Sequence, residues 1–114
     1  MVWRRAVDLI PVVAEVTWRF PEHEKYEIGR QMRRAVASVA FNISEGSGKR
    51  TSKDYISFLH IAYGSANEVE TQVESVSGLG YLKEGEKERL LDELLEIKKM
   101  INGVIRFVRE KNIV

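Results

Sequence analysis

The sequence contains no cysteine, has only two prolines among 114 residues, and has no uninterrupted apolar run long enough to cross a membrane. The lack of cysteine excludes disulfides, thiolate metal ligands and cysteine nucleophiles, and it fits a reducing compartment. Charged residues begin at Arg4 and Arg5, so the start of the chain does not have the pattern of a signal peptide. These features predict a cytoplasmic protein that makes no contact with a membrane.

The chain also lacks a large net charge. Its formal charge is +1 at pH 7, which excludes a globally basic, histone-like mode of nucleic-acid binding. With 44% hydrophobic and 31% charged residues, the composition is typical of a folded, helix-rich protein. A length of 114 residues suits one hydrophobic core, so we expect a single domain over residues 1–114.

Apolar residues recur at intervals of three and four along most of the chain, which is the spacing of amphipathic helices. Breaks at Pro21 and at two glycine-containing runs divide this pattern. The resulting segments predict helices over residues 2–20, 22–46, 52–78 and 84–111. Because the breaks are short, successive helices should be antiparallel, and the sequence predicts an all-α, up-down-up-down four-helix bundle.

Local details of these helices can also be predicted. Pro11 lacks a backbone donor and clashes with the preceding turn, so we expect a kink there or a later helix start. Thr51 or Ser52 should cap the third helix, with Asp54 completing a capping box. Gly64 lies within a predicted helix, where glycine costs about 1 kcal/mol relative to alanine. We therefore expect Gly64 to allow close packing of the two central helices.

Polar side chains interrupt the predicted contact between the second and third helices. The residues concerned are Asn42, Glu45, Ser65, Glu68 and Gln72. One interpretation is that they hydrogen-bond across helices or to turn backbone and so fix the register of the bundle. The other interpretation makes them part of a subunit interface or of a ligand groove. Apolar residues outside the core stripe, such as Phe41, Phe58, Ile61 and Trp18, favour self-association.

Positive charge gathers between residues 30 and 54, where the only acids are Glu45 and Asp54. The basic residues of this stretch are Arg30, Arg33, Arg34, Lys49, Arg50 and Lys53. A row of arginines along a helix can follow a phosphate backbone, and the aromatic residues Tyr26, Tyr55 and Trp18 are candidate neighbours. The stretch therefore predicts a nucleic-acid-binding surface. The alternative is a solvated face whose cations pair with acids of the same chain, of an adjacent subunit or of a protein partner.

No constellation of catalytic residues is found in the sequence. The residues around Lys49 resemble a phosphate-binding loop, but that motif needs glycine at position 43 and Ser or Thr at position 50, where the chain has Ile43 and Arg50. A di-iron bundle needs a glutamate three residues before histidine, and neither His23 nor His60 has one. We therefore expect no enzymatic activity, no catalytic residue, no bound metal and no cofactor.

Several runs of the sequence together resemble one protein family. They are FPEHEKY at 20–26, QMRRA at 31–35, SVAFNISEGSG at 38–48, FLHIAYGS at 58–65 and LGYL at 79–82. The family comprises bacterial four-helix bundle proteins related to those encoded within intervening sequences of large-subunit ribosomal RNA genes, often labelled the S23 ribosomal protein family. The chain departs from the pattern at Ala40, where a proline is common.

The resemblance implies a ring-like homopentamer. A related accessory protein of diversity-generating retroelements works beside a reverse transcriptase and RNA, which implies RNA or an RNA-associated protein as a partner. The residues and the resemblance together predict a non-enzymatic oligomer that binds RNA or a ribonucleoprotein through a basic face. The competing prediction is a homo-oligomeric scaffold that binds a protein partner without touching nucleic acid.

Overall fold

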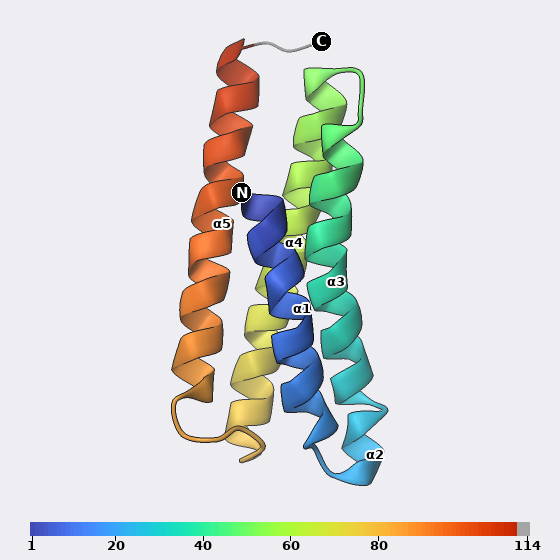
Figure 1. Cartoon of the computed structure of the whole chain (residues 1–114), viewed down its shortest axis with the longest axis vertical. Helices are drawn as coiled ribbons and strands as arrows, with labels where there is room; N and C mark the ends of the chain where they lie inside the picture. Colours follow the sequence, from blue (N-terminus) through green and yellow to red (C-terminus); the bar gives the residue numbers. More distant parts are fainter. Residues whose placement is uncertain (112–114) are drawn as a thin grey trace.

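The computed structural model describes residues 1–111 of the chain. Its helices are α1 (Val2–Trp18), α2 (Glu22–Lys25), α3 (Ile28–Ser47), α4 (Ser52–Gly78) and α5 (Glu86–Lys111), and the described part contains no strand. α1 and α4 run in one direction along the bundle and α3 and α5 in the other (Figure 1). The predicted all-α four-helix bundle is confirmed.

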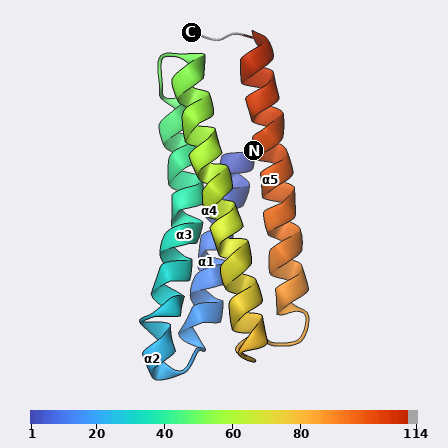
Figure 2. The ribbon, with the colours of Figure 1, turned by 180° about the vertical axis from the view of Figure 1, so that it is seen from behind.

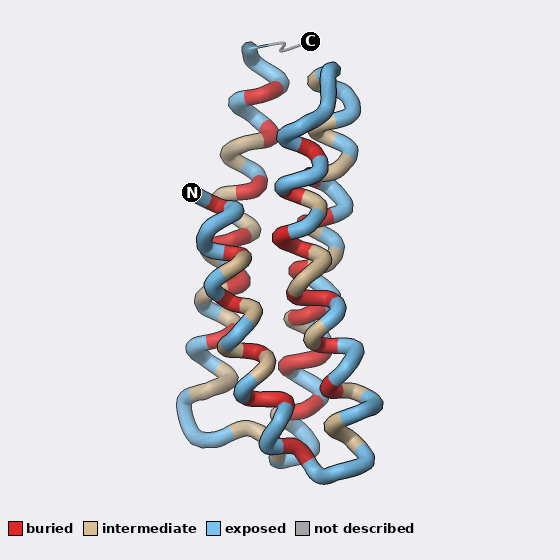
Figure 3. The backbone as a smooth tube through the Cα atoms, turned by 45° about the vertical axis from the view of Figure 1, so that its right-hand side comes forward, coloured by how far each residue is buried: buried red, intermediate tan, exposed pale blue. Residues whose placement is uncertain are grey.

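Each long helix turns a stripe of apolar side chains towards one core. The largest fully buried side chains include Met32, Leu59, Leu90, Leu94, Ile97 and Ile101. Figure 3 shows buried segments recurring along the inner sides of the helices. α3 packs extensively against α4 and against α1, whereas α1 and α5 touch at few points. The boundary between α1 and α5 is therefore the least closed side of the bundle.

α1 is the shortest of the long helices and begins part-way along the bundle, as Figures 1 and 2 both show. The end that holds the α3–α4 turn and the last turns of α5, here called the turn end, consequently contains three helices. The opposite end, here called the α2 end, contains α2 and the connection from α4 to α5. A cavity of about 410 Å³ lies beside the first turn of α1, with Trp3, Ile43, Tyr55 and Val104 among its lining residues.

The single helix predicted over residues 22–46 is wrong, because the chain forms two helices there. It leaves helical geometry at Tyr26 and Glu27, where Glu27 has a φ of −106° and a ψ of −92°. The Arg33 side chain donates from Nη2 to the backbone carbonyl of Lys25, at 3.2 Å. A side chain of α3 thus satisfies a carbonyl at the end of α2 that a continuous helix would have used itself.

α1 also differs from its prediction. It begins at Val2, where its predicted range begins, and continues through Pro11, so of the two outcomes expected at Pro11, a kink or a late start, the late start is wrong. Pro11 is exposed, and its ring displaces no core side chain. The helix ends at Trp18 and not at Phe20, because the next two backbone amides each bond to the carbonyl three residues back.

The remaining helix boundaries follow local rules. The Thr51 hydroxyl caps α4 by accepting a hydrogen bond from the Asp54 amide at 3.2 Å, as predicted. Gly80 and Gly85 have φ angles of +81° and +85°. Glycine adopts this left-handed conformation at no steric cost. Gly80 therefore ends the turn after α4, and Gly85 delays the start of α5 to Glu86.

Close packing of the two central helices occurs at a different glycine from the one predicted. A Cβ placed on Gly64 would meet nothing within 4 Å, and Gly64 is exposed, so the expectation for this residue is wrong. A Cβ placed on Gly46 would lie 2.8 Å from the Cβ of Phe58 and 3.2 Å from the carbonyl oxygen of Tyr55. Gly46 therefore brings the end of α3 against the first turns of α4.

Candidate nucleic-acid interface

The six basic residues predicted to bind nucleic acid form two separate groups. Arg30, Arg33 and Arg34 lie in the first two turns of α3, at the α2 end. Lys49, Arg50 and Lys53 lie in the α3–α4 turn and the first turn of α4, at the turn end. The part of α3 that separates the groups is about 20 Å long at 1.5 Å per residue. The chain therefore presents two small basic surfaces in place of the single patch that the sequence suggests.

Arg33 has the most closely defined surroundings of the six. Its Nη1 donates to Oγ1 of Thr17 at 3.0 Å, and its Nη2 donates to the carbonyl of Lys25. Its guanidinium carbon lies 5.0 Å from the centre of the Trp18 ring, within range of a cation–π interaction. Thr17 is fully buried and its hydroxyl donates to the carbonyl of Ala14. Arg33 is thus half-buried and fixed against α1.

Arg30 and Arg34 are exposed, four residues apart on the same side of α3. Neither forms an ion pair with a carboxylate of residues 1–111. Glu22, one of the nearby acids, is already paired with Lys25 at 3.3 Å. The two guanidinium groups are therefore open to an anionic partner.

The basic residues at the turn end are also exposed. The Lys49 ammonium lies 3.6 Å from the carboxylate of Glu45 and 5.0 Å from the ring centre of Phe58. Within residues 1–111, Arg50 and Lys53 have no ion pair. Only Lys49 of this group is thus engaged, and an exposed pair of this kind contributes little to stability.

The last turns of α5 add basic residues at the turn end that sequence reasoning missed. They are Arg106, Arg109 and Lys111, and all are exposed. The C-terminal end of α5 and the α3–α4 turn lie at the same end of the bundle in both ribbon views (Figures 1 and 2). These three residues carried no distinctive signal in the sequence, because basic residues at a helix C-terminus are common partners of the helix dipole.

The predicted polar residues between α3 and α4 form one bridge across the helices. The hydroxyls of Ser38 and Ser65 lie 2.9 Å apart, and the side-chain amide of Asn42 donates to the Ser38 carbonyl at 2.8 Å and to its hydroxyl oxygen at 3.0 Å. Asn42 therefore reaches α4 through Ser38. This contact agrees with the interpretation that polar side chains here fix the register of the bundle.

The hydrogen bonds and ion pairs of the other three predicted polar residues within residues 1–111 are all to side chains four positions away in the sequence. The Gln72 amide donates to the Glu68 carboxylate at 3.4 Å, and Glu45 pairs with Lys49. Gln72 is 7% exposed, and its side-chain oxygen has no hydrogen-bond partner among the described residues. A buried acceptor without a partner costs free energy, and the hydrogen-bonding capacity of the Gln72 side chain is not fully used within residues 1–111.

Large apolar side chains are exposed beside this polar bridge. Phe41 is 68% exposed on α3, and Ile61 is 49% exposed on α4. The contact between Ser38 and Ser65 places Phe41 and Ile61 at a similar height on the two antiparallel helices. Exposed side chains of this size on neighbouring helices are typical of an interaction surface.

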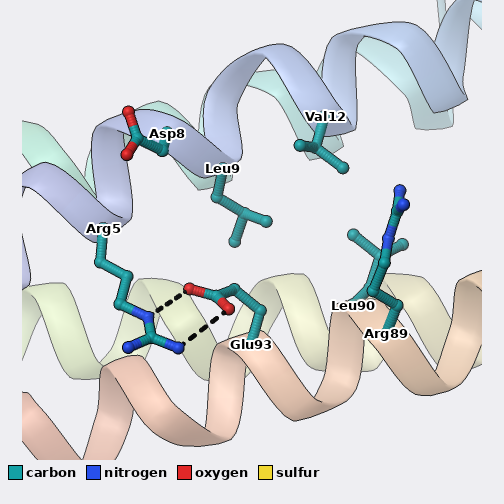
Figure 4. A pocket seen from close by; sticks show the side chains of 7 residues that line it. All are labelled: Arg5, Asp8, Leu9, Val12, Arg89, Leu90 and Glu93. Carbon is teal, nitrogen blue, oxygen red and sulfur yellow. Dashed lines mark hydrogen bonds and ion pairs between the residues drawn. The ribbon is translucent and has the colours of Figure 1, made fainter.

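A groove of about 450 Å³ lies where α1 and α5 separate. It is lined by Arg5, Asp8, Leu9, Val12, Arg89, Leu90 and Glu93, which Figure 4 shows from close by. Arg5 donates from Nε to Glu93 at 2.7 Å and from Nη2 to the same carboxylate at 3.3 Å. This hydrogen bonding and the charge of Glu93 raise the pKa of Arg5. The groove is thus spanned by a two-point ion pair that connects α1 to α5.

Metal sites and membrane-spanning helices are two further features to consider in the described residues. Residues 1–111 include no group of three or more His, Asp or Glu side chains arranged to hold a metal ion. In the same part of the chain, no helix has both the length and the apolar character needed to span a bilayer.

Comparison with known proteins identifies the family. Residues 1–103 match the family model described as 23S rRNA-intervening sequence protein. The chain belongs to this family. The residues that match the family model include both predicted basic groups, whereas Arg106, Arg109 and Lys111 lie beyond residue 103. The resemblance noted in the sequence is therefore confirmed.

A solved structure with the same fold belongs to a protein of unknown function from the S23 ribosomal protein family of Bacteroides thetaiotaomicron VPI-5482. It is 23% identical to this intervening sequence protein, with a TM-score of 0.85, over 92% of this chain and 98% of the other. At that identity the likeness shows the fold alone. A search of curated proteins found no match to the chain.

Proposed function

We propose that this intervening sequence protein is a non-enzymatic homo-oligomer that binds RNA or a ribonucleoprotein through its exposed basic side chains. The observation that carries the proposal is that Arg30, Arg34, Arg50 and Lys53 are exposed and form no ion pair within residues 1–111. Cations without a competing carboxylate can exchange their counterions for phosphate groups. The proposal locates the protein in the cytoplasm, where large-subunit ribosomal RNA is found.

Self-association is part of the proposal, because each subunit carries only a few cations at either end. Two or three phosphate contacts give weak binding, but a closed assembly repeats them in every subunit and gains from effective concentration. Exposed Phe41 and Ile61 and the unpartnered Gln72 oxygen support a subunit contact on the α3–α4 side. The family resemblance favours five subunits.

A second candidate function is a scaffold that binds a protein and not RNA. It is favoured by Glu84, Glu88 and Asp92, which are exposed and have no ion pair within residues 1–111. These acids would meet the basic groups of an adjacent subunit or partner. In that case Arg30 and Arg34 would be buried in a protein contact and would not be open to phosphate.

Size exclusion with light scattering, with absorbance read at 260 and 280 nm, gives the mass of the assembly and any nucleic acid that co-purifies. Binding of a single-stranded RNA is then measured as salt is raised. For single strands, the logarithm of the binding constant falls by about 0.7 per phosphate contact for each tenfold rise in salt. We expect a steep dependence that becomes shallower in R30Q/R34Q and in R50Q/K53Q.

The control is R89Q/K99Q, which removes the same charge from exposed positions of α5 outside both basic groups. Its salt dependence should match that of the native protein. Absence of RNA binding at low salt would contradict the proposal. Loss of the oligomer in R30Q/R34Q, together with absence of RNA binding by the native protein, would favour the scaffold.

A further inference from the structure

Two aromatic side chains are exposed next to each other at the α2 end. Trp18 is the last residue of α1 and is 50% exposed, and Tyr26, in the break between α2 and α3, is 45% exposed. Their ring centres lie 6.0 Å apart, with the ring planes at 83° to each other. This edge-to-face contact fixes the two rings relative to one another while leaving about half of each open to a ligand.

Two cations lie near the Trp18 ring. The Arg33 guanidinium carbon lies 5.0 Å from the ring centre and the Lys25 ammonium lies 5.3 Å from it. Arg33 is held in this place by Thr17 and by the Lys25 carbonyl. Its position over Trp18 is therefore set by the fold and does not depend on a ligand.

Two acids of the same region are already occupied, whereas Glu27, next to Tyr26, is exposed and has no ion pair within residues 1–111. Glu22 pairs with Lys25 at 3.3 Å, and Glu24 accepts a hydrogen bond from the hydroxyl of Tyr81 at 3.1 Å. Arg30 and Arg34, in the adjoining turns of α3, have no such partner within the described residues. Arg30, Arg33 and Arg34 have no ion pair within residues 1–111 and leave this surface with excess positive charge, so it favours an occupant that combines a flat apolar group with negative charge.

We infer that Trp18, Tyr26 and Arg33 form a stacking platform for an unpaired base of single-stranded RNA. An unpaired nucleotide has the required chemistry, because its base stacks on aromatic rings and guanidinium planes while its phosphates take the neighbouring cations. Arg30 and Arg34 contact those flanking phosphates. Bases within a duplex are already stacked and cannot reach the platform. The inference rests on the proposed function and adds to it a preference for unpaired RNA.

Trp3 provides a matched control within the same chain. It is 43% exposed, and the Arg4 guanidinium carbon lies 5.2 Å from its ring centre. Arg4, however, is paired with Asp8 at 3.2 Å. No second aromatic ring of residues 1–111 packs against Trp3. Trp3 therefore has the exposure and the cation, but not the arrangement, of the platform.

The direct test uses fluorescence. The sequence has two tryptophans, so W3F leaves Trp18 as the only tryptophan emitter. Titration of W3F with a short single-stranded oligoribonucleotide should quench Trp18 to saturation, at the same concentrations at which binding is seen by anisotropy of labelled RNA. The corresponding RNA duplex should bind with little quenching. Equal quenching by the duplex, or binding of the single strand without quenching, would overturn the platform.

Affinity provides the second test. W18A should lower the affinity for the single strand about tenfold, within the range measured for loss of one base–aromatic stack, and W18F should recover part of it. W3A should change the affinity less than about twofold, because Trp3 belongs to no platform. Circular dichroism and light scattering establish that each variant keeps its fold and assembly.

The two proposals fail in different ways. If native protein binds RNA but folded W18A binds it equally well, the platform is wrong and the proposed function stands. If native protein binds no RNA at low salt, both are wrong. If W18A loses its oligomeric state while W3A retains it, Trp18 belongs to a contact between subunits and the platform is overturned.

Discussion

The two ends of α3 carry basic side chains in different surroundings. At the α2 end, Arg33 is held by Thr17 and by the Lys25 carbonyl, and it lies over an aromatic ring. At the turn end, Arg50 projects from the α3–α4 turn and Lys53 from the first turn of α4, and neither has an ion pair among the described residues. The comparison shows that similar local charge can support different tasks. Under the proposed function, the fixed cation beside aromatic rings would select a base, whereas the unconstrained cations would attract phosphate without selection.

The fold also holds the two ends by different means, and the largest effect should come from the turn end. The substitution G46V would place a branched side chain where Gly46 has none. Its Cβ alone would lie 2.8 Å from the Cβ of Phe58 and 3.2 Å from the carbonyl oxygen of Tyr55. Overpacking of this kind should lower the free energy of unfolding by roughly 3 kcal/mol. Urea unfolding followed by circular dichroism measures it.

The control for this substitution is G48V. Gly48 lies two residues further along, in the turn, where a Cβ would be 3.7 Å from the nearest atom outside its neighbours. Its cost should stay below about 1 kcal/mol, as for most exposed positions. Equal effects of the two substitutions would mean that Gly46 does not set the approach of α3 to α4.

At the α2 end, an ion pair should give the next largest effect. Glu86 accepts hydrogen bonds from the Arg19 side chain and from the Lys83 amide. The hydrogen bond from Arg19 is the main cause that lowers the pKa of Glu86 below the usual 4.5. Because the pKa is lower in the folded state, this stabilisation is complete above the unfolded pKa and is lost as pH falls through the folded one.

E86Q should therefore lower the free energy of unfolding by about 1–2 kcal/mol at neutral pH, since a charged hydrogen bond is removed. On acidification, the native protein should lose stability towards the level of the variant. Urea unfolding across the acidic range measures both curves. E88Q, an exposed position without an ion pair within the described residues, should change stability by less than about 0.5 kcal/mol. Parallel pH curves for E86Q and native protein would refute the linkage.

T17V tests the support of Arg33 itself. The substitution keeps the volume of the buried side chain but removes the acceptor for Nη1 of Arg33. A hydrogen bond of this kind contributes about 1 kcal/mol, and we expect that loss in thermal or urea unfolding. T71V removes a hydroxyl bonded only to its own helix, at Asn67, and should cost less than about 0.5 kcal/mol. A T17V protein as stable as T71V would show that Arg33 needs no such support.

The smallest effect on stability should come from G29A. A Cβ on Gly29 would lie 3.2 Å from Nη1 of Arg33, the far end of a flexible side chain, and 3.3 Å from the Cβ of Thr17. Slight crowding should offset the helix preference of alanine, leaving a change within about 0.5 kcal/mol. In G64A nothing opposes that preference, and unfolding should show a gain of about 0.5–1 kcal/mol. An equal gain in G29A would mean that Arg33 is not tightly placed.

The features that were predictable from sequence depend on local periodicity. The approximate positions of the long helices and the buried stripes that include Leu94 and Val73 follow from apolar spacing, and the cap at Thr51 follows from its hydroxyl and from Asp54 three residues later. The break at Tyr26 and Glu27 was not predictable, because it depends on Arg33 reaching a carbonyl eight residues earlier and on its contact with α1. Such contacts exist only after the helices have packed.

The candidate site was predictable in part. Its residue types were visible in the sequence, but their grouping was not, since a stretch that is continuous in sequence occupies both ends of one helix. The rise of an α-helix could have shown this separation. The contribution of Arg106 and Arg109 could not be found this way, because it depends on which end of the bundle α5 reaches.

Because α1 begins part-way along the bundle, the free energy of local opening should differ between the two ends of the molecule. At the turn end, beyond the first turn of α1, the backbone of α3, α4 and α5 is screened by fewer neighbouring turns than in the part of the bundle that contains α1 (Figures 1 and 2). Local opening needs the least free energy where least surface is buried. Deuterium uptake should therefore be fastest at the turn end and slower along α3, α4 and α5 towards α2. The surface richest in unconstrained cations is then also the part of the bundle that opens first.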